Sequence, residues 1–191
     1  ADYATKIYDG LELTTNDWIY LDSPYEVVSG ETLTIETSGS IVNTGIKTNP
    51  IESYKVLKAD EEDSSTNYDV EFDHNAELEI TPRYLSIYII DKEEEYFGDY
   101  LTSNDWDYIV DAYNDGKPHE LVGDEELILT TSGKVKYVEK GKTSKTVDNE
   151  YVSHTVTKPN GDDSYMNYVL DVKQKGTLTI IQREVGLKTY S

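Results

Sequence analysis

The sequence contains no cysteine among its 191 residues, which excludes disulfides, thiolate metal sites and a cysteine nucleophile. It also lacks any apolar run near the ~20 residues that a membrane-spanning helix requires, so we expect no membrane insertion of this segment. No signal peptide opens the chain, which begins at Ala1 without a methionine. We therefore expect an excised segment of a longer protein, stabilised by large β modules rather than by covalent links.

Basic residues are scarce, because 17 lysines and arginines stand against 38 aspartates and glutamates, for a net charge of -21. A field this negative repels nucleic-acid phosphates and anionic lipid, so we expect neither as a partner. The same charge favours solubility and attracts divalent cations. A solvated acidic surface without a specific partner is the commoner explanation of such a composition.

Alanine is scarce and no segment sustains a helical stripe, whereas tyrosine (17 copies), valine, isoleucine and threonine are abundant. These residues suit a pleated, half-buried surface. Polar and apolar residues alternate over 31–36, where Leu33 and Ile35 would face inward, and again over 77–80 and 177–180. The best helical candidate, 106–113, would give one or two turns. The composition predicts an all-β fold.

Three short motifs recur in the same order, which marks a tandem repeat. The motifs at 13–18, 37–39 and 67–68 return at offsets of 88, 94 and 100. We predict two small Ig-like β-sandwich modules arranged end to end. Residues 1–83 form the first module, 84–184 the second, and 185–191 the start of an outgoing linker. Pro82 suits the boundary because it cannot donate to a central ladder.

Each module is expected to contain several strands and to close with a hairpin. The hairpin of the first module would span 67–80 and turn at His74-Asn75, and that of the second would turn at Lys175-Gly176. A turn is expected at 140–142 and a loop over the acidic run 60–65. The strands are predicted at 31–37, 41–46, 51–58, 126–131, 134–138 and 144–158.

The paired Asn-Asp-Trp motifs make Trp18 and Trp106 the candidate ligand-binding residues, because an exposed tryptophan is a frequent sugar platform or interface anchor. The alternative is that each tryptophan fills the core of its module, with Asn-Asp shaping the preceding turn. Recurrence in both modules favours the structural alternative.

The loops carrying Glu62 and Asp63, and Asp162 and Asp163, are the candidate metal sites, because calcium takes about six to eight oxygen ligands. The alternative is a turn in which Asp and Ser bind local backbone amides. We favour the turn, and so expect no cofactor, with calcium as the alternative. An EF-hand is excluded at 111–122, where Val122 stands at the position of the bidentate glutamate.

Nothing in the spacing indicates catalysis. The histidines His74, His119 and His154 lie in three different contexts, with no nucleophile and acid placed beside them. Residues 141–143 resemble the end of a phosphate-binding loop, but Lys136 replaces the required earlier glycine. Lys58 and Lys158 are equivalent in the repeat and could form a Lys–Asn cross-link only if buried, yet both border polar loops. We expect a non-catalytic protein.

The motifs at 6–10, 67–68 and 78–83 together resemble the YDG and MBG repeat domains, which occur in tandem in large surface adhesins of Gram-positive bacteria. The second copy departs from this pattern at 96–99 and at 181–183. The resemblance implies a non-catalytic, extracellular, wall-attached protein that acts as a stalk or an adhesive surface.

Two functions follow from this resemblance. One is binding of a host glycoprotein or glycan by a monomeric module, and the other is a structural spacer that presents a distal adhesive domain. An exposed aromatic patch in only one module would favour binding. Two similar charged surfaces with all aromatic residues buried would favour the spacer.

Overall fold

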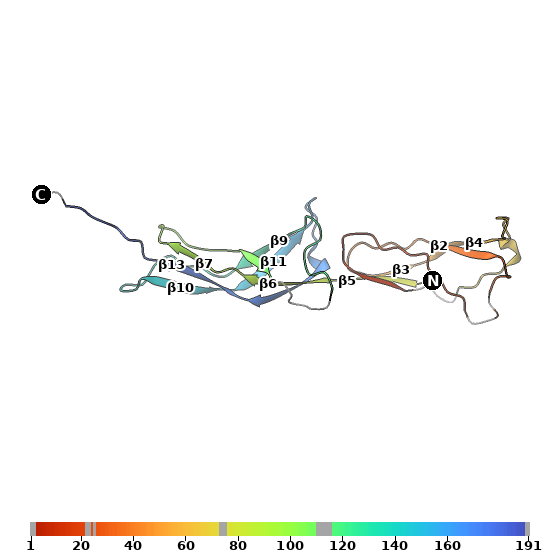
Figure 1. Cartoon of the computed structure of the whole chain (residues 1–191), viewed down its shortest axis with the longest axis horizontal. Helices are drawn as coiled ribbons and strands as arrows, with labels where there is room; N and C mark the ends of the chain where they lie inside the picture. The colour runs from red at the N-terminus through yellow and green to blue at the C-terminus, as the bar shows by residue number, and fades with distance from the viewer. Residues whose placement is uncertain (1–2, 22–23, 25, 73–75, 110–115, 190–191) are drawn as a thin grey trace. The chain divides into compact units, whose positions relative to one another are not determined.

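The computed structural model describes residues 3–21, 24, 26–72, 76–109 and 116–189 (Figure 1). Among these residues the regular structure is β-strand, with two short 3-10 turns and no α-helix. The all-β prediction is confirmed. The chain divides into two compact units, Ala1–Pro82 (unit 1) and Arg83–Ser191 (unit 2). No helix in the described part of the chain has the length and apolar character to cross a membrane.

Unit 1 builds two small sheets. In the first, β5 lies between β1, to which it runs parallel, and β3, to which it runs antiparallel. In the second, β2 pairs antiparallel with β4. Its described elements are β1 (Ala4–Ile7), β2 (Thr32–Thr37), β3 (Gly45–Asn49), β4 (Ile51–Leu57), the 3-10 turn η1 (Ser65–Asn67) and β5 (Ala76–Thr81).

Unit 2 repeats both sheets and adds a third. The sheet β10-β13-β7 reproduces β3-β5-β1, and β11-β9 reproduces β4-β2, while β12-β6-β8 has no counterpart among the described strands of unit 1. Its described elements are β6 (Arg83–Ile89), β7 (Lys92–Glu95), β8 (Trp106–Tyr108), β9 (Glu126–Thr131), β10 (Ser144–Asn149), β11 (Tyr151–Thr157), the 3-10 turn η2 (Tyr165–Asn167), β12 (Tyr168–Gln174) and β13 (Gly176–Ile181).

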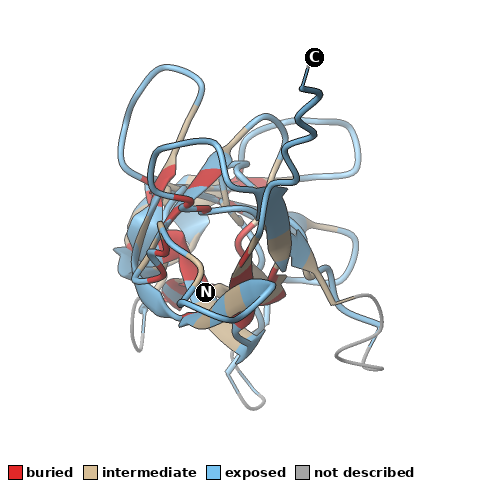
Figure 2. Ribbon diagram, turned by 90° about the vertical axis from the view of Figure 1, so that its left-hand side faces the viewer, coloured by how far each residue is buried: buried red, intermediate tan, exposed pale blue. Residues whose placement is uncertain are grey.

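Alternation along the strands places the core. β2 and β9 have the same burial pattern, with Leu33 and Ile35 buried in β2, as predicted, and Leu127 and Leu129 buried in β9. Figure 2 shows that buried residues occur among the strands and that the long loops are exposed. Each fully buried side chain of this size contributes about 1.5–3 kcal/mol relative to an exposed one. The alternation of apolar and polar residues therefore determines which face of the strand is buried in both units.

A buried asparagine ends β3 and β10. The Asn149 side chain accepts a hydrogen bond from Gly133 N (2.9 Å) and donates one to Ser103 O (2.8 Å). Asn49 makes the same two bonds in unit 1, to Gly39 N and Thr15 O, both at 2.8 Å. Each asparagine has 0 % exposure, so its amide satisfies backbone groups that water cannot reach. We call this arrangement the asparagine clasp.

The predicted closing hairpins are wrong. β12 and β13 are consecutive, but β12 pairs with β6, whereas β13 pairs with β10 and β7. The chain thus crosses between sheets at Gly176, where a Cβ would lie 2.9 Å from Ile89 Cγ2 and from Ile90 O. The residues at the turn predicted that β12 and β13 would pair with each other. Tertiary packing instead determines which strands pair.

The closing segment of unit 1, residues 67–80, also does not pair as the predicted hairpin. β5 pairs with β1 and β3, and residues 68–72 form no strand. The turn predicted at His74-Asn75 lies outside the described residues.

Three further segments differ from the sequence-based expectation. Residues 106–108 form strand β8 rather than helix, because the segment pairs with β6, and 110–113 lie outside the described residues. Residues 134–138 form a single bridge at Val135 instead of a strand. The extended segment 144–158 is two strands, interrupted at Glu150. The turn expected at 140–142 is present, with Lys142 N donating to Glu139 O.

A matched pair of turns gives a test of backbone strain. Glu61 has a positive φ of 67°, and Gly161 has φ 88° at the equivalent position of unit 2. A left-handed conformation costs a non-glycine residue about 1–2 kcal/mol. We expect Glu61→Gly to raise the free energy of unfolding of unit 1 by up to ~1 kcal/mol. The gain is smaller than the strain that is relieved, because glycine also increases the entropy of the unfolded state.

The reverse change, Gly161→Glu, should destabilise unit 2 by about 1–2 kcal/mol. Urea unfolding followed by tryptophan fluorescence measures both effects, since each unit holds one tryptophan, Trp18 or Trp106. A loss of stability in Glu61→Gly would contradict the strain argument.

Candidate ligand-binding surface

One backbone bridge brings two distant segments of unit 2 together. Leu101 and Val135 exchange hydrogen bonds of 2.8 and 3.2 Å, and both side chains are buried. Because side chains alternate along extended chain, the flanking Tyr100, Lys134 and Lys136 are directed away from the core. The bridge therefore gathers one aromatic ring and two ammonium groups on the outer side.

Further aromatic rings surround this point. Lys134 Nζ lies 4.1 Å from the centroid of the Tyr100 ring, and Lys136 Nζ lies 5.1 Å from the same ring and 5.5 Å from that of Tyr137. The rings of Tyr96 and Tyr137 have centroids 6.2 Å apart. The aromatic residues of the group are 36 % to 59 % exposed. We define the aromatic–lysine surface as Tyr96, Phe97, Tyr100, Lys134, Lys136 and Tyr137.

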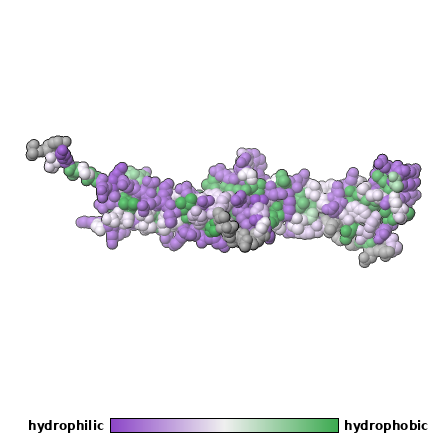
Figure 3. Space-filling view, viewed as in Figure 1, coloured by the Kyte–Doolittle hydropathy of each residue, from purple (hydrophilic) through white to green (hydrophobic). Residues whose placement is uncertain are grey.

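One of the two segments that form the aromatic–lysine surface is rich in lysine, whereas the other, residues 92–100, carries four acids and one lysine. Residues 134–145 contain five lysines and one acid, Glu139, although the whole chain has a net charge of -21. Figure 3 shows a predominantly hydrophilic face with only scattered hydrophobic areas. A lysine held over an aromatic ring gains about 0.5–1 kcal/mol at an exposed site, which orders the ammonium groups without removing them from solvent. Such a surface favours an anionic ligand.

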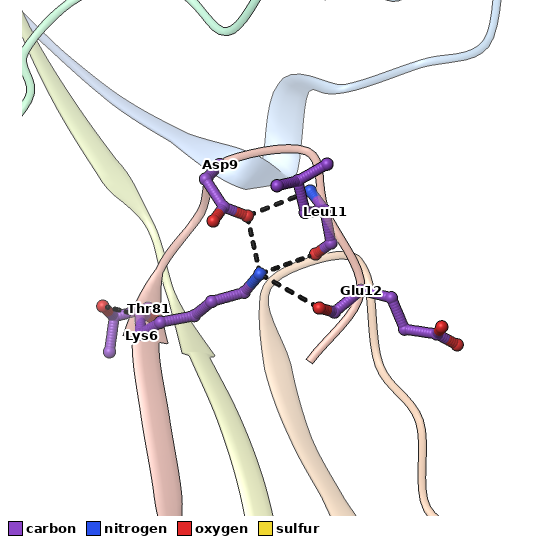
Figure 4. A network of polar contacts seen from close by, with 5 residues as sticks. All are labelled: Lys6, Asp9, Leu11, Glu12 and Thr81. Atoms are coloured by element: carbon purple, nitrogen blue, oxygen red, sulfur yellow. Dashed lines mark hydrogen bonds and ion pairs between the residues drawn. The ribbon is translucent and has the colours of Figure 1, made fainter. Parts of the chain in front are cut away.

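Unit 1 has a different chemistry at the equivalent positions. Tyr8, the counterpart of Tyr96, has 0 % exposure. Lys6 Nζ binds Asp9 Oδ1 at 2.7 Å and the carbonyl oxygens of Leu11 and Glu12 at 2.8 and 3.3 Å (Figure 4).

Asp9 completes that network by accepting a hydrogen bond from Leu11 N at 2.9 Å. Burial raises the pKa of Asp9, but the hydrogen bonds from Lys6 and Leu11 outweigh it and hold the pKa below its usual value. Lys6 is thus engaged by its own loop. The equivalent described positions of unit 1, 8–13 and 40–44, do not form an exposed aromatic–lysine group.

A second aromatic cluster lies at β11, where His154 pairs opposite the buried Leu129. His154 Nδ1 is 2.8 Å from Tyr151 Oη, and its ring centroid is 4.8 Å from that of Tyr165. Burial lowers the pKa of His154, whose Nε2 atom has no hydrogen-bond partner within the described residues. The imidazole is therefore neutral near pH 7, so this cluster carries less positive charge than the aromatic–lysine surface.

The two tryptophans named from the sequence are half-buried. Trp106 packs edge to face on Tyr108 (centroids 5.1 Å apart) and donates from Nε1 to Leu127 O at 3.2 Å. Trp18 packs in the same way on Tyr20, with centroids 4.7 Å apart. Both rings pack within their own units, but neither is fully buried, so each tryptophan remains a candidate ligand-binding residue.

In both acidic loops the carboxylates accept hydrogen bonds from neighbouring residues of the same loop or strand end. Hydrogen bonds from the Ser65 side chain and backbone lower the pKa of Asp63, and the hydrogen bond from Lys58 lowers that of Glu62. In unit 2, Asp163 accepts from Tyr165 N at 2.8 Å, and Asp162 accepts from Asn160 Nδ2 at 2.9 Å. Within the described ranges, no group of three His, Asp or Glu side chains could hold a metal ion.

The remaining candidates lie apart from one another. Lys58 forms an ion pair of 2.6 Å with Glu62 and is 42 % exposed, which does not fit a buried cross-link. His119 Nδ1 lies 2.9 Å from Tyr84 O, and His74 lies outside the described residues. Comparisons with protein-family models, with curated protein sequences and with solved structures found no match for this chain.

Proposed function

We propose that this chain is a non-catalytic pair of extracellular repeat modules from a bacterial surface protein, and that unit 2 binds a host glycoprotein or glycan. The observation that supports binding is the exposed aromatic–lysine surface, which the equivalent described positions of unit 1 do not reproduce. A fold duplicated for spacing alone requires no such difference between its copies. The bacterial-surface setting rests on the resemblance of the repeat motifs.

The chemistry of the surface favours a sugar that carries a carboxylate or a sulfate. Exposed tyrosine rings offer flat apolar faces and a polar hydroxyl, which suits the mixed character of a pyranose ring. Lys134 and Lys136 stand beside these rings and would donate charge-assisted hydrogen bonds to the acidic group. Sialylated and sulfated glycans are therefore the expected ligand class.

The alternative function is a structural spacer that presents a distal adhesive domain. It is favoured by the residues that the two units share, because the asparagine clasps and the Trp–Tyr pairs all serve the fold. The two functions are compatible in one chain, and only ligand binding distinguishes them.

Binding of the purified chain to a panel of mucins, matrix proteins and glycans tests the proposal. We expect saturable binding to sialylated or sulfated members, loss after desialylation or desulfation, and no change with a calcium chelator. If no member of the panel binds, the structural spacer would remain as the function. Binding that required calcium would indicate the acidic loops in place of the aromatic–lysine surface.

A further inference from the structure

Unit 2 has a lysine-rich insertion in the segment that leads into β10. Equivalent residues of the two units differ in number by 94 at Val135 and by 100 at Asn149, so unit 2 gains six residues between these positions. Residues 134–145 contain five of the 17 lysines and arginines of the chain, whereas the equivalent residues 40–45 contain none. The insertion therefore adds basic residues to a chain whose net charge is -21.

This segment is anchored on the core of unit 2. Val135 belongs to a buried apolar cluster of the unit, and Val138 packs against the same cluster. Lys142 N then donates to Glu139 O at 3.0 Å, which closes a turn before β10 begins. The lysines are therefore carried by an anchored segment and a hydrogen-bonded turn, which limits the conformations that a ligand must select.

Most lysines of this segment lack the acidic partners that several other lysines have. Its one acid, Glu139, is ion-paired with Lys145 at 3.2 Å. The other four lysines of the segment, at positions 134, 136, 140 and 142, form no ion pair with any residue that the structure describes. Ion pairs with aspartate or glutamate are made in other segments by Lys6, Lys58, Lys92, Lys173 and Lys175. Uncompensated positive charge is thus concentrated in this segment.

The four ammonium groups lie within reach of one extended ligand. Lys134 Nζ and Lys136 Nζ are 4.1 and 5.1 Å from the centroid of the Tyr100 ring. Lys140 and Lys142 are exposed on the turn that follows. The chain from Lys134 to Lys142 would span at most about 29 Å even if it were fully extended. A linear polymer would therefore contact all four lysines, whereas one terminal sugar would reach only the pair beside Tyr100.

We propose that the ligand of the aromatic–lysine surface is a linear sulfated polysaccharide, which lies over Tyr100 and continues along Lys140 and Lys142. The inference rests on the proposed function and narrows its ligand class, because a glycan with one terminal acid would leave the lysines of the turn without a partner. Each lysine ammonium is a compact charge that donates up to three hydrogen bonds, which suits the oxygens of a sulfate group.

A broad anionic partner fits this segment less well. A membrane surface or a nucleic-acid duplex would also face the acidic remainder of the chain, including the four acids of residues 92–100. Repulsion between exposed charges falls off over a Debye length of about 8–10 Å at physiological ionic strength. A single polysaccharide chain follows the lysines at close range and keeps most of the acidic surface beyond that distance.

Isothermal titration calorimetry of the full chain with heparin oligosaccharides tests the proposal. We expect a decasaccharide to bind about tenfold or more tightly than sialyllactose, which carries one carboxylate. A desulfated decasaccharide, which keeps its carboxylates, should lose this advantage. Lys140→Gln/Lys142→Gln should weaken binding of the sulfated decasaccharide roughly tenfold and leave binding of sialyllactose unchanged.

The matched control is Lys173→Gln/Lys175→Gln, because both lysines lie in unit 2 and are ion-paired, and the net charge of the chain changes by the same amount. This variant should bind the decasaccharide within about twofold of the original chain. Equal weakening by both double variants would overturn the proposal, since overall charge would then explain the binding.

The results for the parent chain separate this inference from the proposed function. If sialyllactose binds and the sulfated decasaccharide binds no more tightly, the proposed function stands and the polysaccharide is overturned as the ligand. If neither binds, both proposals are overturned. Phosphatidylserine vesicles or a DNA duplex that bound as tightly as the decasaccharide would also overturn the inference, because the surface would then accept any polyanion.

Discussion

Replacing Asn149 with alanine is expected to lower the free energy of unfolding of unit 2 by about 1–3 kcal/mol. The substitution removes the amide that binds Gly133 N and Ser103 O, at 2.9 and 2.8 Å. Gly133 N belongs to a buried residue and would lose its partner without gaining water, whereas Ser103 O keeps the hydrogen bond from Thr131 Oγ1 at 2.6 Å. An unsatisfied buried donor costs about 1–3 kcal/mol, and one is created.

Urea unfolding in a Trp18→Phe background measures this effect, because Trp106 then reports on unit 2 alone. Asn160→Ala is the control, since Asn160 makes its hydrogen bonds to Asp162 within an exposed loop. We expect a change below about 1 kcal/mol for the control. A similar small change for Asn149→Ala would show that water or another group replaces the clasp.

Reversing the charge of Lys134 and Lys136 is expected to weaken binding of a sialylated or sulfated glycan about a hundredfold. A hydrogen bond to a charged group contributes about 1.5–3 kcal/mol, and 1.4 kcal/mol corresponds to a tenfold change in affinity. The double variant Lys134→Glu/Lys136→Glu removes two such donors. Because both side chains are on the surface, the fold should persist with an unchanged circular dichroism spectrum.

The matched control is Lys47→Glu/Lys55→Glu in unit 1, which changes the net charge of the chain by the same amount. If the glycan responds only to overall charge, both double variants weaken binding equally, and the aromatic–lysine surface is not the site. Isothermal titration calorimetry at two salt concentrations separates the two cases. The specific contact should remain measurable at the higher salt, where long-range attraction is screened.

Patterns confined to one strand could be predicted from the sequence. Alternation placed Leu33 and Ile35 inside, and the strand predicted at 126–131 is β9. The partners of a strand could not be predicted in this way. Lys175-Gly176 has the residues of a hairpin turn, yet Gly176 marks a crossing between sheets against Ile89. Local turn chemistry describes the path of the chain over a few residues but not the sheet that each strand joins.

The asparagine clasp and the aromatic–lysine surface were both missed for a related reason. Asn49 and Asn149 recur at the repeat offset, which was a usable signal, but nothing local indicates that an asparagine is fully buried. Tyr100 and Lys134 meet only because Leu101 and Val135 form a bridge across the unit. Contacts of this kind depend on tertiary structure, so sequence reasoning selected the tryptophans instead.

Hydrogen exchange of the full chain with and without a saturating sialylated or sulfated glycan tests the central claim most directly. A bound ligand slows exchange where it covers or rigidifies the backbone. We predict slower exchange in peptides covering 96–101 and 134–138, with no change at the unit 1 equivalents, 8–13 and 40–44. Equal protection of both units, or protection confined to the acidic loops, would contradict a duplicated fold in which unit 2 alone acquired a binding surface.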